Sequence, residues 1–90
     1  MTKLSMQGYV RGKVQGVGFR RATVRQATKL GLDGWVRNCP EGTVEVMLCG
    51  EDQAMEAMTE WLRHGPAAAK VEAVELNACA WQDIAGFVQL

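Results

Sequence analysis

The residues best suited to do chemistry lie in one stretch near the amino terminus, from Val10 to Arg20. Its sequence is Val-Arg-Gly-Lys-Val-Gln-Gly-Val-Gly-Phe-Arg, in which an alternating apolar pattern leads into a glycine-rich loop and a helical pattern follows. A strand, a glycine loop and a helix start together present main-chain N–H groups to an anion. Arg20 adds a planar, permanently charged fork that suits phosphate. The stretch therefore favours a phosphate site.

The glycine loop by itself leaves two interpretations open. Gly16 and Gly18 permit backbone angles and close approaches that suit either an anion site or a plain tight turn. The loop is neither a Walker P-loop nor a dinucleotide fingerprint, because no Gly-Lys-Ser/Thr follows and the third glycine is missing. Arg20 and Arg21 favour the anion, because they lie at a helix start that is already partly positive and has no acidic residue. The alternative is that both side chains extend into water.

Asn38 and Cys39 lie at the end of an expected strand, just before a turn over residues 39–42. Asparagine before a turn is common, so the residue pattern alone favours a structural role for Asn38. Cys39 would need a base to act as a nucleophile, and the single histidine, His64, lies at the far end of the second expected helix. We therefore expect no cysteine catalysis.

Cysteine and histidine do not form a metal-binding pattern. Cys39, Cys49 and Cys79 are widely spaced, with no Cys-x-x-Cys pair, whereas a structural zinc site uses four ligands at tight spacing. We expect no metal and no cofactor, and three reduced thiols that mostly pack as small hydrophobic groups.

Composition indicates one domain, residues 1–90, with 48% hydrophobic and 22% charged residues. No apolar stretch approaches the ~20 residues of a membrane span, and no secretory signal is visible, so we expect a cytoplasmic protein that does not enter membranes. Tyr9, Phe19 and Trp35 could suggest an RNA-binding sheet. The required motif strand is absent and the pI is near 6.6, which argues against nucleic acid as a partner.

Charge is divided unevenly along a chain whose net charge is zero. The first 40 residues carry eight cations and one acid, a net +7, and the rest carry two cations and nine acids, a net −7. This division predicts a surface with one end that attracts anions, unless the strands of the sheet interleave the two halves.

Hydrophobic periodicity predicts a short list of elements. We expect strands over 4–11, 34–38, 43–49 and 71–76, a short strand within 85–90, a helix over 21–30 that ends at Gly31, and a helix capped by Asp52 that ends at 64–66. The faces expected to be buried carry Thr23, Ala27 and Leu30 in the first helix and Met55, Met58 and Leu62 in the second. The order β-α-β-β-α-β predicts a ferredoxin-like α+β sandwich, with two helices on one face of an antiparallel sheet.

Two motifs in this chain resemble those of the acylphosphatase family. The first, V-x-G-x-V-Q-G-V-x-F-R, is matched throughout residues 10–20. The second is glycine, aromatic, small, basic and asparagine, then three residues, G-x-V, five residues and glycine. Residues 34–38, 42–44 and Gly50 match it. Family members often end their last strand with a basic or aromatic residue, whereas this chain has Val88-Gln89-Leu90.

The resemblance implies a small monomeric enzyme that hydrolyses small-molecule acyl phosphates without metal or cofactor. Main-chain N–H groups of the loop would hold the phosphate, in the residues Gln15, Gly16, Val17, Gly18 and Phe19. Arg20 would clamp the phosphate oxygens, and Asn38 would hold the attacking water, so the resemblance raises Asn38 from a structural to a catalytic role. The alternative is a non-catalytic module that binds phosphorylated metabolites or proteins. Such a module needs the loop and Arg20 but no residue to hold water.

Overall fold

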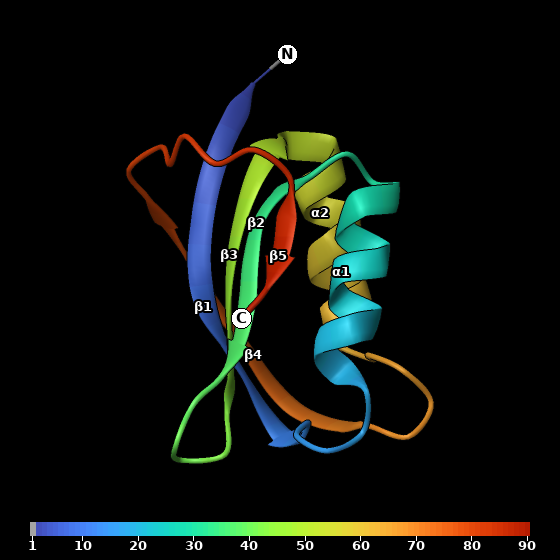
Figure 1. Ribbon diagram of the computed structural model, residues 1–90. Coiled ribbons are helices and arrows are strands. Elements are labelled where there is room, and N and C mark those ends of the chain that lie inside the picture. The colour runs from blue at the N-terminus through green and yellow to red at the C-terminus, as the bar shows by residue number, and fades with distance from the viewer. Residues whose placement is uncertain (1) are drawn as a thin grey trace.

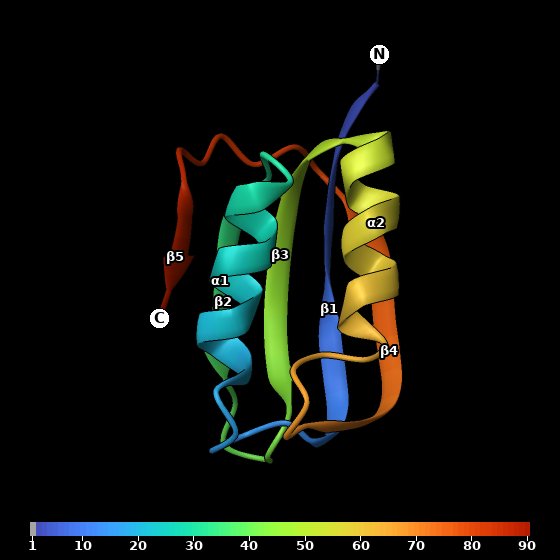
Figure 2. The same cartoon turned by 90° about the vertical axis from the view of Figure 1, so that its right-hand side faces the viewer.

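The computed structural model describes residues 2–90 and contains one five-stranded sheet with two helices on the same face (Figure 1). The elements follow the chain as β1 (Lys3–Lys13), α1 (Phe19–Lys29), β2 (Asp33–Asn38), β3 (Val44–Glu51), α2 (Asp52–Leu62), β4 (Lys70–Cys79) and β5 (Phe87–Gln89). The predicted α+β ferredoxin-like fold is confirmed, and α1 and α2 lie side by side in front of the sheet (Figure 2).

The strand order across the sheet is β4-β1-β3-β2-β5. The first four strands in the chain pair antiparallel, as predicted, with β1 between β3 and β4. The short strand β5 pairs parallel to β2, with Trp35 opposite Val88, so the complete sheet is mixed. The segment after β4 crosses one end of the sheet to reach this position (Figure 1).

The close pairing of β1 with the edge strand β4 requires a glycine in β1. A Cβ atom at Gly8 would lie 1.7 Å from the carbonyl oxygen of Glu75 in the neighbouring β4. This distance is far inside van der Waals contact, so the two strands pair closely here only because residue 8 has no side chain.

The hydrophobic core lies between the helices and the inner face of the sheet. The sheet contributes fully buried valine and leucine side chains, and both helices add a buried stripe; the core includes Val10, Val36, Val46, Leu48, Phe19, Ala27, Met55, Met58 and Leu62. Each such large apolar side chain contributes about 1.5–3 kcal/mol by leaving water. The stripes predicted for both helices are buried, although Leu30 is only partly covered.

Several element boundaries differ from the prediction. Helix α1 begins at Phe19, two residues early, because Gly18 turns the chain in a left-handed conformation directly before it. Asp52 is the first residue of α2 and not its cap; Glu51 holds the cap position without a side-chain hydrogen bond. Strand β4 extends beyond 71–76 at both ends, because it pairs with β1 along most of its length.

None of the helices within residues 2–90 is both long enough and apolar enough to span a bilayer.

Candidate active site

The loop between β1 and α1 takes its shape from two left-handed glycines. Gly16 has φ 72° and Gly18 has φ 77°, and no atom would lie within 4 Å of a Cβ added at either position. Space therefore does not require glycine at these positions. The backbone conformation does, since residues with side chains rarely adopt it.

Main-chain N–H groups of this loop are left without partners. Across residues 2–90, no hydrogen bond is donated by the main-chain N–H groups of residues 15–18. Helix α1 follows immediately, and Gly18 at its N-cap position provides no side chain to cap the first turn. The first turn of any helix has N–H groups without intrahelical partners. The loop and the helix start therefore present a continuous set of free donors.

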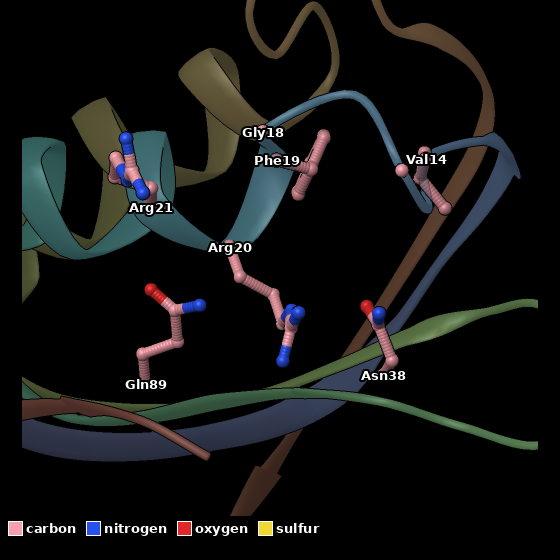
Figure 3. A pocket seen from close by; sticks show the side chains of 8 residues that line it. Val14, Gly18, Phe19, Arg20, Arg21, Asn38 and Gln89 are labelled. Carbon is pink, nitrogen blue, oxygen red and sulfur yellow. The ribbon is translucent and has the colours of Figure 1, made fainter.

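The two arginines at this helix start lie differently. Arg20 is half-buried and extends between Asn38 and Gln89 (Figure 3), and its Nη1 donates to the main-chain oxygen of Leu90 at 2.8 Å. Arg21 is exposed and lies apart from Asn38. Both line a cavity of about 310 Å³, together with Val14, Gly16, Gly18, Phe19, Asn38 and Gln89. The cavity thus brings the glycine loop, the helix start and the end of β2 together.

Asn38 carries the most unusual polar atom in this cavity. Its Oδ1 is buried and has no hydrogen-bond partner among the described residues. Leaving a buried oxygen unpaired costs about 1–3 kcal/mol. The amide lies at the end of β2 and faces the space occupied by the Arg20 side chain (Figure 3). An oxygen held in this way can accept a hydrogen bond from a molecule that enters the cavity.

Three predicted loop residues direct their side chains elsewhere. Phe19 is 1% exposed and packs against Trp61, with ring centroids 5.8 Å apart. Val17 packs partly against the core. Gln15 directs its amide to the turn after β2, where Nε2 donates to the main-chain oxygens of Cys39 and Thr43. For these three residues, only main-chain atoms remain available for the phosphate binding that the sequence predicts.

Gln89 was missed by the sequence analysis. It lines the cavity because β5 pairs parallel to β2 beside α1, and no local sequence pattern predicts that pairing. Val14 was also missed, although its place at the end of the alternating strand pattern could have indicated it.

The cysteines and the histidine lie outside this chemistry. Cys39 and Cys49 are buried and Cys79 is exposed. His64 lies two residues after α2, where its Nε2 is 3.4 Å from Glu60 Oε1, and it does not line the cavity. Within residues 2–90, no three His, Cys, Asp or Glu side chains group closely enough to hold a metal ion.

Some opposite charges from the two halves of the chain lie next to each other in the sheet. This is what we expect if the strands interleave the two halves and reduce the predicted charge separation. Arg37 Nε donates to Glu45 Oε1 at 2.6 Å, and this bond raises the pKa of Arg37. Arg11 lies 3.7 Å from Glu75 across β1 and β4. Among the described residues, the cavity lining includes two arginines and no carboxylate side chain. A positive region that attracts anions therefore remains at the start of α1.

Comparison with known proteins gives consistent matches. The family model described as Acylphosphatase matches residues 6–88. An acylphosphatase of Pseudomonas aeruginosa is 50% identical over 88 residues, which are 98% of this chain and 97% of the relative. An acylphosphatase structure from Coxiella burnetii superposes with a TM-score of 0.95 at 38% identity, over 98% of this chain and 93% of that chain. One from Bacillus subtilis gives 0.92 at 31% identity, over 97% of each chain.

Proposed function

This chain belongs to the acylphosphatase family and is a hydrolase of acid anhydrides, and from that premise we propose how it holds and cleaves an acyl phosphate. In this proposal the loop holds the phosphate, Arg20 clamps it, and Asn38 positions the attacking water. The observation that carries the proposal is the buried, unpaired Oδ1 of Asn38, in the same cavity as Arg20.

Phosphate binding in this proposal depends on hydrogen-bond donors and on positive charge. The free N–H groups of residues 15–18 and the first turn of α1 supply hydrogen bonds, and the N-terminal end of a helix favours an anion. The Arg20 guanidinium donates to the phosphate oxygens as a planar fork. The same groups stabilise the charge that spreads over these oxygens in the transition state.

In this proposal the attacking water is made effective by its position beside Asn38, and not by a strong base. A water that donates one O–H to Asn38 Oδ1 keeps a lone pair free to attack phosphorus. As its oxygen bonds to phosphorus, the bond from phosphorus to the acyl oxygen breaks and the carboxylate leaves with the electron pair. The proton lost by the water passes to phosphate or solvent. Because a carboxylate is a good leaving group, positioning and charge stabilisation suffice without a strong base or nucleophile.

We further propose that the chain works as a single domain and a monomer in the cytoplasm, on small-molecule acyl phosphates, with no cofactor and no nucleic-acid partner. One sheet and one core support the single domain. The pI near 6.6 supports the absence of nucleic acid.

The experiment that tests the mechanism measures phosphate release from acetyl phosphate by the wild type and Asn38→Ala, with and without EDTA. We expect kcat to fall about 100-fold in Asn38→Ala, by analogy with loss of other positioned polar groups, while inhibition by inorganic phosphate is unchanged. EDTA should have no effect. If phosphate inhibition and kcat fall in parallel, Asn38 shapes the phosphate site instead. A wild-type protein that binds phosphate but releases none from the substrate would support the non-catalytic binding module.

A further inference from the structure

The two parts of the active site belong to separate segments of the chain. The phosphate loop joins β1 to α1, and the turn after Asn38 joins β2 to β3. Gln15 connects them directly: its Nε2 donates to the main-chain oxygen of Cys39 at 2.8 Å and to that of Thr43 at 2.9 Å. One neutral amide thus uses both of its protons to fasten the loop to the turn.

The two carbonyl groups that Gln15 contacts are the ones that close this turn. Cys39 N–H donates to the Thr43 oxygen at 2.9 Å, and Gly42 N–H donates to the Cys39 oxygen at 3.1 Å. Each carbonyl oxygen therefore accepts one bond from within the turn and one from Gln15. Cys39 directly follows Asn38, so the amide of Gln15 fixes the backbone one residue from the proposed water-holding side chain.

We propose that Gln15 is a positioning residue that sets the distance between the phosphate loop and the Asn38 amide. The proposal rests on the proposed function, because it assigns Gln15 an effect that passes through Asn38. It also corrects the simple expectation that Gln15 contributes only its main-chain N–H. Only a neutral donor of this length fits: a carboxylate would face two carbonyl oxygens without a proton to share, and asparagine is one methylene shorter.

The test replaces Gln15 by two side chains of similar size. Gln15→Glu removes both donors and adds repulsion, and Gln15→Met removes the donors without adding charge. For both variants we expect kcat for acetyl phosphate to fall about 10- to 100-fold, as a misplacement near 1 Å can produce. Inhibition by inorganic phosphate should be nearly unchanged in the neutral Gln15→Met and weakened in Gln15→Glu, whose new charge lies on the phosphate loop. The control, Gln53→Glu, makes the same change in charge at an exposed position of α2 and should keep wild-type kcat.

A double-mutant cycle separates this role from a structural one. If Gln15 acts through Asn38, each Gln15 substitution should lose nearly all of its effect on kcat in the Asn38→Ala background. The proposal would be overturned if a Gln15 substitution lowered kcat by the same factor in the wild-type and the Asn38→Ala backgrounds. It would also be overturned if both folded Gln15 variants kept wild-type kcat. If circular dichroism shows that neither variant folds, Gln15 is a structural residue and the proposal is wrong. Wild-type kcat in Asn38→Ala alone would instead overturn the proposed function.

Discussion

The two helices of this protein have the same length and begin in opposite ways. Both have 11 residues, bury one stripe against the same face of the sheet, and lie side by side (Figure 2). Helix α2 begins with an acid, and Asp52 Oδ1 accepts a bond from the Gln53 N–H at 2.9 Å. Helix α1 follows the left-handed Gly18, has no acid in its first turn, and carries Arg20 and Arg21 there.

This difference is the one we expect if the start of α1 exchanges local stability for binding. A capping side chain contributes about 0.5–2 kcal/mol, and an acid near a helix start contributes about 0.3–1 kcal/mol. Neither helix has a side-chain hydrogen bond from its N-cap residue, but α1 also lacks the first-turn acid that α2 has and adds like charges to its positive end. At the start of α2, Asp52 N–H donates to the main-chain oxygen of Thr2 and Gln53 N–H donates to Asp52 Oδ1, whereas the start of α1 has the features we expect of an anion site. The packing faces do not differ in this way, so the contrast is specific to the helix starts.

The largest expected effect comes from removing the half-buried cation of α1. Arg20→Ala should lower kcat/KM for acetyl phosphate by about 10³-fold or more, because a charge-assisted fork to phosphate is lost in binding and in the transition state. Arg20→Lys should recover little, since a point charge does not replace the fork. The matched control is Arg21→Ala, at the exposed neighbouring position, which should keep most of the activity. Near-wild-type turnover in Arg20→Ala would remove this residue from the site.

Phosphate should stabilise the protein through the loop of residues 15–18 and the start of α1, and not through α2. At ten times its dissociation constant, phosphate should add RT ln 11, about 1.4 kcal/mol, or roughly 6 °C in Tm. Thermal unfolding of the wild type and Arg20→Ala at matched ionic strength measures this shift. The specific part should vanish in Arg20→Ala, leaving any general salt effect. Equal shifts in both proteins would mean that the loop is an ordinary turn.

An acid in the first turn of α1, as α2 has, should stabilise the protein and weaken its binding of phosphate. Arg21→Glu places an acid in the first turn and removes a cation, which should stabilise the phosphate-free protein by about 1 kcal/mol. The same change should weaken inhibition by phosphate. Urea unfolding and phosphate inhibition measure the two effects, and Arg25→Glu, farther along the same helix and also exposed, controls for net charge. Stabilisation without weaker inhibition would separate the helix start from the phosphate site.

The smallest effect is expected at the start of α2. Asp52→Asn removes the charge that favours this helix end and should cost about 0.5 kcal/mol in urea unfolding. Its kcat should equal that of the wild type, because Asp52 does not line the cavity with Arg20. A large loss of activity in this variant would contradict the division of roles between the two helices.

Sequence patterns predicted the features that depend on interactions between residues close together in the chain. The alternating strands, the helical stripes and the order of elements followed from periodicity, and the left-handed Gly31 lies just after α1, where the sequence placed a helix end. The motifs directed attention to Arg20 and Asn38, which line one cavity. Their roles in catalysis stay predictions.

Features that depend on distant contacts could not be predicted in the same way. The amide of Gln15 finds its partners 24 and 28 residues away, and nothing near residue 15 specifies them. The parallel pairing of β5, which brings Gln89 to the cavity, also joins distant segments through a strand of three residues. The cap of α2 was misplaced by one residue, because Glu51 and Asp52 are both acidic and pattern alone does not choose between them.

The bond from Arg20 to the main-chain oxygen of Leu90 joins residues 70 positions apart. Contacts of such long sequence separation are reached late, because most of the chain must be ordered before they close. We therefore expect the arginine to reach its final orientation only when β5 docks, after the helices and the central strands. Regained turnover then reports the last step of refolding, and it should lag behind the recovery of helical signal when denaturant is diluted.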